Sequence, residues 1–543
     1  MRKFLLLMTI LGLCLPNSLW AQERTVSGKV TSEVDGSSLP GVSVLLKGTS
    51  TGTVTDVEGN YRLSVPTTGG TLTFSFIGFT TTDVAIGANS VIDVTLSEDV
   101  KQLSEVVVVG YGTQLKQDLT GNIAKVSGSQ VENIPVPSFE QAIQGRAAGV
   151  FVEASNGKLG QGIKVRVRGT SSLSAGSQPL YVVDGVPITS QSQTALSGDT
   201  NPLADLNSFD IESIEILKDA SAAAIYGSRG ANGVVIITTK RGKSEKTNFN
   251  INFMTGFSEP TNHVEWLNTA EYVELFQEAR ANTGYISVAS LEARLDRYAG
   301  GVRAAWQDPS SPSYVDTDWD RQALVRGSIN QIDFSASGGT EKTRFYTSLS
   351  SSNQDGILLG TAFDKVNGRI NLDHEANDKL SLGMSFSLGR TINSRVPDDN
   401  AFSTPLQMIA LPPLTPIIDT RTNLLSGVLD LTTGLPNSNF PLYYNPLIDI
   451  NYNDNTNTVF RNLGTFYGSY NILDNLRFRS EFGYDLLSQH EERYLASVAS
   501  RNTGAPNGQG DDIRTQVFNY TTNNFLSYNV SFGQHELEAV GGM

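Results

Sequence analysis

The sequence predicts a mainly β protein whose C-terminal part supplies strands of a transmembrane antiparallel β-barrel. After the first fifteen residues no run of 18 apolar residues occurs, so no membrane-spanning helix is expected. Beyond Glu245, apolar and polar residues alternate over about ten residues at a time, which is the length of a tilted spanning strand. The connections between these segments are alternately short and long, a pattern typical of outer-membrane barrels.

The composition excludes several functional classes. The 543 residues carry a formal net charge of -15, whereas a nucleic-acid-binding protein would need a basic face. Cys14 is the only cysteine, which argues against a disulfide framework, a thiolate metal site and a cysteine nucleophile. The four histidines are far apart and have no HExxH or CxxC companion, so a zinc enzyme is not expected. We therefore expect no metal, no cofactor and no enzymatic activity.

Residues 1–21 have the pattern of a secretory signal peptide. Arg2 and Lys3 precede a short apolar stretch over residues 4–15, and Ala21 supplies a small residue at the expected cleavage site. The apolar stretch is too short for a stable membrane span. The sequence therefore predicts export, with an uncleaved anchor as the alternative.

Residues 22–98 are expected to form a small β-sandwich, because short alternating segments recur at even spacing between turn signals. Residues 48–52 match the GxSxG pattern of a nucleophile elbow, but no helix follows them, so a hairpin turn is expected instead. The stretch GVSVLLKGTSTGTVTDVEGNYRLSVP (41–66) resembles the carboxypeptidase-regulatory-like domain. That domain is an accessory module, and the resemblance implies no peptidase activity.

Two further regions precede the barrel strands. Residues 99–115 form a linker with a short β-prone run at 104–109, which is either a buried strand or a strand offered to a partner. The run alone favours the buried strand. Residues 116–244 are expected to fold as a mixed α and β domain. In it, Asp184-Gly185 predicts a hairpin turn, and Asp219 is expected to cap a short helix over 220–226.

Four blocks of this α+β domain carry a family resemblance. They are IQGRAAGV (143–150), IKVRVRG (163–169), PLYVVDGVPI (179–188) and IESIEILKDASAAAIYGSRGANGVVIITTKRGK (211–243). Together they resemble the plug domain of TonB-dependent outer-membrane transporters. With LSEVVVVGYGT (103–113) ahead of them, they look like the SusC-like (SusC/RagA-type) branch found in Bacteroidota.

The resemblance implies roles for individual residues. In the family, a short strand ahead of the plug is the TonB box, which pairs with TonB; here it would comprise Glu105, Val106, Val107, Val108 and Val109. Three plug arginines would pair with carboxylates of the barrel wall, or else lie at solvated strand edges: Arg166, Arg168 and Arg229.

Residues 245–543 are expected to be the first part of the barrel. Nine strands are predicted near 249–257, 332–336, 345–349, 366–372, 380–388, 457–472, 476–486, 526–532 and 536–543. A barrel of about 22 strands is needed to enclose a plug, so the barrel is expected to be truncated at residue 543. As given, this polypeptide would not be expected to transport alone.

Five aromatic residues in two long predicted loops are candidates for contact with a substrate or a lid protein. Local packing within the loops is at least as good an explanation. The candidates are Trp266, Trp306, Trp319, Tyr443 and Tyr444. The first loop is also expected to contain a helix with Asn268 as its N-cap.

The resemblance implies TonB-dependent import of a nutrient across the outer membrane, as the channel of a SusCD-type complex. An oligosaccharide is the first candidate substrate and a peptide the second. The implied partners are TonB, with ExbB and ExbD supplying energy, a SusD-like surface lipoprotein and outer-membrane lipid. The plug and the N-terminal domain would lie on the periplasmic side. The alternatives are a surface receptor or adhesin without transport, and an inactive truncated product.

Overall fold

The computed structural model describes residues 23–33, 36–49, 51–67, 70–76, 79–87, 89–97, 106–109, 112–115, 123–132, 134, 136, 138–154, 157–170, 176–196, 198–284, 287–396, 411–430, 435–436, 445, 447–499, 508–533 and 535–543. The predicted signal peptide lies outside these residues and stays a prediction. Two compact units make up the chain: an N-terminal unit and a larger one that comprises Val108–Gly112 and Thr120–Met543.

The N-terminal unit is the predicted β-sandwich. One sheet has the order β4-β1-β7 and the other β3-β2-β5-β6. Their apolar faces meet in a core that includes Val30, Leu63 and Phe74, and Tyr61 packs edge-on against Phe74 at 5.3 Å between ring centres. Strands β2 and β3, which flank the GxSxG match, pair as the expected hairpin, and Ser50 of the match lies outside the described residues. The strands are β1 (Glu23–Ser32), β2 (Ser43–Leu46), β3 (Gly52–Val54), β4 (Asn60–Pro66), β5 (Gly70–Ser75), β6 (Thr82–Ile86) and β7 (Val94–Leu96).

Two short strands follow, β8 (Val106–Val109) and β9 (Gly112–Leu115), and they pair with each other in a sheet of their own. β8 contains four of the five residues of the predicted TonB box. Because β9 occupies only one edge of β8, the two-stranded sheet leaves the second edge of β8 without a strand partner among the described residues.

The α+β domain, here called the plug, is built on a mixed sheet of order β10-β15-β16-β13-β14. Apolar residues of β15 and β16 are almost entirely buried, since this sheet packs against the short helix α2 and the β11–β12 hairpin. The plug elements are β10 (Ile123–Ser127), α2 (Phe139–Ala142), β11 (Val150–Ala154), β12 (Ile163–Val167), β13 (Leu180–Val183), β14 (Val186–Pro187), β15 (Ile211–Leu217), α3 (Ala220–Ala223) and β16 (Val234–Thr239), with 3-10 turns at Gly128–Gln130, Ser208–Asp210 and Ala224–Gly230.

The expected cap of the short plug helix is only half right. Asp219 stands at the N-cap position of α3, but its carboxylate makes no capping hydrogen bond. It forms an ion pair with Arg168 instead. The α-helix ends at Ala223 and continues as a 3-10 turn, and the non-helical backbone of Gly227 (φ 62°, ψ -149°) lies directly after the expected range of 220–226.

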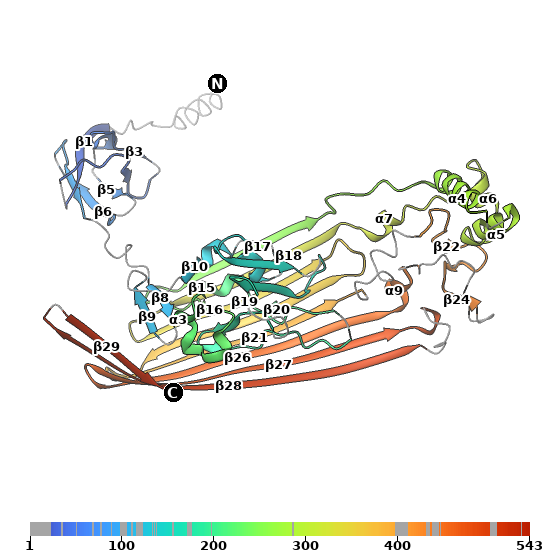
Figure 1. The fold of residues 1–543 in the computed structure, drawn as a ribbon. Coiled ribbons are helices and arrows are strands. Elements are labelled where there is room, and N and C mark those ends of the chain that lie inside the picture. Colours follow the sequence, from blue (N-terminus) through green and yellow to red (C-terminus); the bar gives the residue numbers. More distant parts are fainter. Residues whose placement is uncertain are drawn as a thin grey trace, which may run out of the picture. The chain divides into compact units, whose positions relative to one another are not determined.

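The remaining strands form one antiparallel nine-stranded sheet, here called the wall, in which each strand pairs with its neighbours in chain order. Figure 1 shows these strands running side by side, with plug elements on one side of them. All nine predicted barrel strands are confirmed. They are β17 (Asn248–Ser258), β18 (Gly327–Gly339), β19 (Thr343–Asp355), β20 (Ala362–Glu375), β21 (Leu380–Ser394), β26 (Asp454–Leu473), β27 (Leu476–Leu495), β28 (Gln509–Phe532) and β29 (His535–Gly542).

The exposed face of the wall is mostly apolar, and most of its buried side chains are polar. Phe249, Ile251 and Phe253 on β17 are each about two-thirds exposed, whereas Asp333 and Asp485 are 0% exposed. This is the reverse of a water-soluble sheet and matches a strand wall that faces lipid on one side and a plug on the other. Among the described residues, no helix has the length and apolar character needed to cross a membrane.

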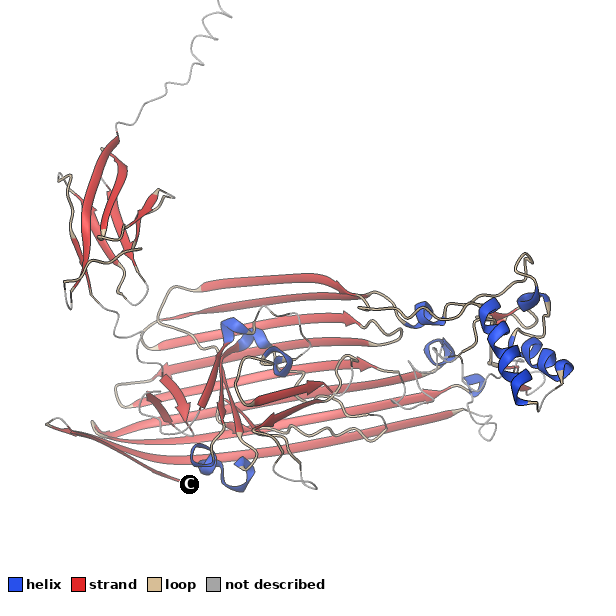
Figure 2. Ribbon diagram, turned by 45° about the horizontal axis from the view of Figure 1, so that its top comes forward, coloured by secondary structure: helices blue, strands red, loops and turns tan. Residues whose placement is uncertain are grey.

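The long connections gather beyond one end of the wall strands and the short turns lie at the other end (Figure 2). Asn268 caps the first loop helix as predicted, accepting a hydrogen bond from Glu271 N (3.0 Å). The loop elements are α4 (Thr269–Thr283), α5 (Val288–Tyr298), α6 (Ala304–Gln307), α7 (Trp319–Ala323), β22 (Ile418–Asp419), β23 (Leu424–Leu425), β24 (Leu429–Asp430), β25 (Leu435–Pro436) and α9 (Leu447–Tyr452), with a 3-10 turn at Ser497–Ala499.

Candidate functional site at the plug–wall interface

The turn between β13 and β14 fastens the plug to the wall through one carboxylate. Asp184 and Gly185 both have left-handed backbone angles (φ 46° and 87°), so the predicted hairpin turn is confirmed. The Asp184 carboxylate accepts hydrogen bonds from Thr239 of the plug (2.8 Å from Oγ1) and from Ser385 of β21 (3.0 Å). It also lies 3.3 Å from Arg369 of β20. A plug turn, a plug strand and two wall strands therefore meet at Asp184.

Arg369 lies between two plug carboxylates. Besides its contact with the hairpin turn, its Nε lies 3.6 Å from Asp210 Oδ2, and both side chains are 6% exposed. Asp210 also accepts a hydrogen bond from the hydroxyl of Tyr346 on β19 (2.9 Å). Asn371 lies two residues after Arg369 on β20, and its Nδ2 donates a hydrogen bond to the carbonyl of Lys240 (2.6 Å). The wall thus holds the plug by side chains that all face inward.

A second group of contacts is centred on a fully buried ion pair between neighbouring wall strands. Arg461 of β26 and Asp485 of β27 are both 0% exposed, and two parallel bonds of 2.8 and 2.7 Å join them. Arg461 also donates to the plug carbonyls of Pro202 (2.7 Å) and Thr189 (2.9 Å), while Asp485 accepts from Thr189 N (2.8 Å). The carboxylate of Asp205 lies 3.7 Å from Arg461. The pair therefore holds the plug loop that follows β14 by hydrogen bonds to its backbone.

The same plug loop is held at a third point, nearer the loop end of the wall. Glu491 of β27 accepts hydrogen bonds from two successive plug amides, Ala195 N and Leu196 N, each at 3.0 Å. Arg395 lies 3.6 Å from the other oxygen of Glu491, and Gln489 donates to that oxygen at 3.1 Å. A carboxylate that receives two backbone N–H groups fixes the position of the loop without requiring a particular plug side chain.

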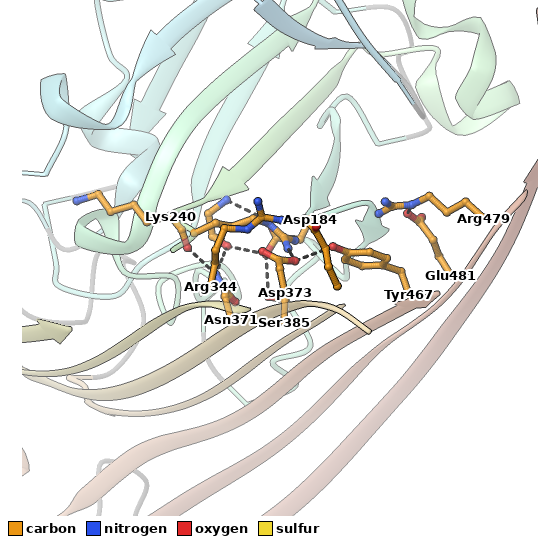
Figure 3. Close-up of polar contacts among 12 residues, drawn as sticks. Asp184, Lys240, Arg344, Asn371, Asp373, Ser385, Tyr467, Arg479 and Glu481 are labelled. Carbon is orange, nitrogen blue, oxygen red and sulfur yellow. Dashed lines mark hydrogen bonds and ion pairs between the residues drawn. The ribbon is translucent and has the colours of Figure 1, made fainter. Parts of the chain in front are cut away.

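A fourth group lies where the chain passes from the plug into the wall (Figure 3). Arg241 pairs with Asp373 of β20 (2.7 Å), and the same carboxylate accepts a hydrogen bond from Tyr467 OH (2.6 Å). Arg479 of β27 stacks over the Tyr467 ring at 3.9 Å and pairs with Glu481 (2.6 Å). These contacts complete a polar interface that runs along β19, β20, β21, β26 and β27.

Most of the interface is polar, although Leu463 of β26 packs against the apolar core of the plug, and this polar character decides what the interface can do. A plug held by an apolar core would expose that core on moving, whereas hydrogen bonds and ion pairs can be exchanged for bonds to water. Several buried polar atoms at the interface have no hydrogen-bond partner among the described residues, a sign of sites that water can fill. They include Asn201 Nδ2, Asp205 Oδ1, Asn367 Oδ1, Asn393 Nδ2 and Asn457 Oδ1. The plug is therefore anchored by contacts that can be broken reversibly.

Removing one member of the buried wall pair should destabilise the protein strongly. In Asp485→Asn, the buried Arg461 guanidinium loses its hydrogen-bonded counter-charge and keeps only the more distant Asp205, which we expect to cost about 3–5 kcal/mol of unfolding free energy. The matched control is Asp511→Asn, which breaks the pair of Arg493 on β27 and Asp511 on the neighbouring strand β28. That pair is about one-quarter exposed, so its loss should cost about 1 kcal/mol or less. Urea unfolding of both variants in detergent measures the difference, and equal costs would contradict this assignment.

Glu140 is a buried plug carboxyl next to this interface. Its side chain is 1% exposed, and one of its oxygens, Oε2, has no hydrogen-bond partner among the described residues. Burial raises the pKa of Glu140 to about 7. Burial also raises the pKa of Asp205, an effect that Arg461 opposes. The plug therefore carries a carboxyl group that is partly protonated near neutral pH.

The folded protein should lose stability between about pH 4.5 and 7 because of Glu140. Its pKa is raised on folding from 4.5, so the folded state holds the proton longer, and this stabilisation disappears as the pH rises through about 7. A shift of this size corresponds to about 3 kcal/mol. Glu140→Gln should remove the pH dependence, because the amide does not titrate. Thermal unfolding of both proteins at pH 5 and pH 8 checks this; identical changes with pH in the parent and the variant would refute it.

Two family models match the chain. The TonB-dependent Receptor Plug Domain matches residues 115–234, and the CarboxypepD_reg-like domain matches residues 26–108. Among curated relatives, TonB-dependent receptor P26 of Formosa agariphila is 35% identical over 97% of this chain and 49% of the relative. TonB-dependent receptor SusC of Bacteroides thetaiotaomicron is 29% identical over 99% of this chain and 51% of the relative.

The chain belongs to the SusC-like TonB-dependent receptors.

The chain spans about half the length of the curated relatives it matches. A solved structure agrees in fold: the RagAB peptide importer in its open-open state has a TM-score of 0.65 and 24% identity, over 81% of this chain and 48% of that chain. The members of this receptor family are outer-membrane β-barrels, and the relatives are receptors and transporters rather than enzymes.

Two of the three plug arginines expected to contact the wall of this SusC-like receptor make contacts inside the plug. Arg166 lies 3.4 Å from Glu153 and stacks over Phe151, and Arg168 pairs with Asp219. Arg229 is an exposed residue of the 3-10 turn after α3. Their pairing with a wall stays a prediction. The contacts with the described wall come from Asp184, Asp210, Arg241 and the plug backbone instead.

Sequence reasoning missed the wall residues of this interface. A signal was present, because charged residues stand at the inward positions of otherwise apolar alternating strands, as Arg369 and Asp485 do. A charge at such a position is costly unless a partner faces it. The strand pattern could therefore have singled out these residues, although not the plug groups that they bind.

The other predicted site residues have mixed outcomes. Val106–Val109 form β8, and Glu105 lies outside the described residues, as do Tyr443 and Tyr444. Trp306 and Trp319 are 5% and 4% exposed, and their indole N–H groups donate to Asp296 (2.9 Å) and the Pro412 carbonyl (3.3 Å). Their burial fits the alternative of loop packing. Trp266, which is 50% exposed, is available for contact with a ligand or partner.

Proposed function

We propose that the protein imports a nutrient across the outer membrane in a TonB-dependent manner, as the SusC-like channel of a complex with a SusD-like surface lipoprotein. The proposed substrate is an oligosaccharide, with a peptide as the alternative. The relatives named TonB-dependent receptor and SusC, and the similarity in fold to the RagAB peptide importer, support this class of function. Transport changes the position of the substrate and makes or breaks no bond in it.

The observation that carries the proposal is the polar interface between plug and wall. Import requires a plug that closes the channel at rest and rearranges when pulled. Arg461, Asp485 and Glu491 hold the plug loop mainly by its backbone, and water can replace each of these bonds when the loop moves. The plug can therefore leave the wall without exposing a large apolar surface to the channel.

The proposed drive acts through β8. The family's TonB box would be residues 105–109, and TonB would add a strand to the edge of β8 that β9 leaves open. ExbB and ExbD would supply the energy for the pull. The plug and the N-terminal sandwich would lie in the periplasm, with the exposed apolar face of the wall against outer-membrane lipid. In this arrangement three plug arginines, Arg166, Arg168 and Arg229, are proposed to pair with wall carboxylates. The proposed domain limits are 22–98 for the sandwich, 99–115 for the linker, 116–244 for the plug and 245–543 for the first part of the barrel.

Energised uptake tests the proposal. Cells that express the gene are given labelled oligosaccharides and peptides, with and without a protonophore that collapses the inner-membrane proton gradient. Accumulation of one class of label that the protonophore abolishes, while surface binding persists, is the expected result. Surface binding with no energy-dependent accumulation would refute import and favour a surface receptor or adhesin.

A further inference from the structure

The loop between β17 and β18 contains a cavity that the plug–wall interface does not use. Its volume is about 420 Å³, which falls in the range of ligand pockets. Two chain segments form most of it: residues 263–268, which lead into α4, and residues 316–321, which lead into α7. Leu411 and Pro413, from the connection that follows β21, close one side.

The charged groups around the cavity are mostly acidic. Its lining contains the carboxylates of Glu265, Asp316, Asp318 and Asp320, against one guanidinium, that of Arg321, and the imidazole of His263. Such a lining creates a negative potential in the cavity, because opposite charges do not balance it.

Local bonds occupy only part of this acidic lining. Asp316 Oδ1 accepts a hydrogen bond from Thr269 N (2.9 Å), and Asp318 pairs with Arg321 (3.2 Å). Asp320, whose side chain is 5% exposed, holds His263 by its Nδ1 atom. Glu265 makes no hydrogen bond or ion pair with any described residue, so its carboxylate remains available to a ligand.

Two indole rings line the same cavity. Trp319 is buried and fixed by its bond to Pro412, so its ring is held rigidly against the cavity. Trp266 is half exposed and lies beside Glu265 in the sequence. An exposed indole face attracts cations through its quadrupole, and the attraction increases when the cation is partly desolvated.

The geometry points to a site for a cationic side chain, the guanidinium or ammonium group of an arginine or lysine in a peptide. Trp266 would lie against the cation and Glu265 would pair with it, as carboxylates and aromatic faces do in sites for organic cations. A neutral sugar can donate hydroxyl hydrogen bonds to these carboxylates, but only a cation also balances their charge, and an anionic ligand would be repelled. If the protein imports what it binds, as proposed above, this site makes a peptide rather than an oligosaccharide its substrate class. That step rests on the proposed function.

Binding to the purified protein tests the site independently of transport. Titration calorimetry in detergent compares three probes: acetylated and amidated Gly-Arg-Gly, the same peptide with Gln in place of Arg, and tri-glucosamine. We expect the arginine peptide to bind best and to weaken when the ionic strength is raised from about 0.05 to about 0.5 M. Trp266→Ala and Glu265→Gln should each weaken it about 5- to 30-fold. Glu274→Gln and Leu275→Ala are matched controls, since both residues are exposed on α4 and outside the cavity.

The possible outcomes separate the site from the import function. Equal binding of the arginine and glutamine peptides overturns the cationic site, even if cells accumulate a nutrient in an energy-dependent way. Tighter binding of tri-glucosamine than of the arginine peptide overturns the peptide assignment. Selective arginine binding that Trp266→Ala abolishes supports the site, even if no energised accumulation occurs and import itself fails. Thermal unfolding at the parent temperature shows that the variants are folded.

Discussion

Proline in β8 should abolish energised import and leave binding of the nutrient at the cell surface unchanged. In an extended strand, successive residues direct their N–H groups to opposite edges. One of Val106 and Val107 therefore points its N–H toward β9 and the other toward the open edge. Proline lacks the N–H, so at the open-edge position it removes a bond that an added TonB strand would need.

The comparison of two neighbouring prolines makes this test specific. Between Val106→Pro and Val107→Pro, the open-edge variant should reduce accumulation to the level seen with a protonophore, and the other should have the smaller effect. Val107→Thr is the conservative control, because strand addition depends on backbone bonds and tolerates a different β-branched side chain. Accumulation is measured with labelled nutrient, and surface binding in the presence of protonophore. Parent-level import by both proline variants would show that β8 takes no part in the process.

The strands of the wall could be predicted from the sequence because lipid imposes a simple rule on them. Lipid-facing positions of a spanning strand are apolar and alternate with inward-facing positions. A run such as Leu380, Leu382 and Met384, separated by small residues, therefore predicts a spanning strand. The short turns could be predicted in the same way, because they lie where the alternation of apolar and polar residues stops. The plug fold was accessible mainly through its resemblance to a known domain, since its short helices and buried strands give weak periodic signals.

The contacts of the candidate site could not be predicted in this way. Arg461 binds the carbonyls of Thr189 and Pro202, and no side-chain pattern in the plug marks those carbonyls as acceptors. Residue type also misled the search for loop contacts. Trp306 carries a large apolar ring, which makes it suitable both for a ligand and for a loop core, and the helices α4, α5 and α6 supply the core.

The same limit explains the three plug arginines. An alternating strand with arginine at every second position indicates a charged face, but not which carboxylate faces it. Arg166 found its partner across the β11–β12 hairpin, where Glu153 lies on the neighbouring strand. A cross-strand pair is the nearest source of opposite charge, and it competes with any more distant partner in the wall.

A disulfide between plug and wall should stop import completely. Val186 of β14 faces Gly483 of β27, and a Cβ atom placed on Gly483 lies 3.3 Å from Val186 Cβ, close to the separation that disulfides require. With cysteine at both positions, the Val186 methyl group that would crowd a side chain at position 483 is removed, and one S–S bond joins the two residues. Cys14, in the predicted signal peptide, is the only other cysteine of the sequence. The bond would prevent the plug hairpin from leaving the wall while the protein stays folded.

The most direct test of the account is therefore energised accumulation of nutrient by cells carrying Val186→Cys/Gly483→Cys, measured before and after reduction, with the two single variants as controls. If import requires the plug to separate from the wall at this hairpin, the oxidised double variant will bind nutrient without accumulating it. Reduction will then restore accumulation to the level of the single variants. Parent-level accumulation by the fully oxidised protein would contradict the central claim that the polar plug–wall contacts open during transport.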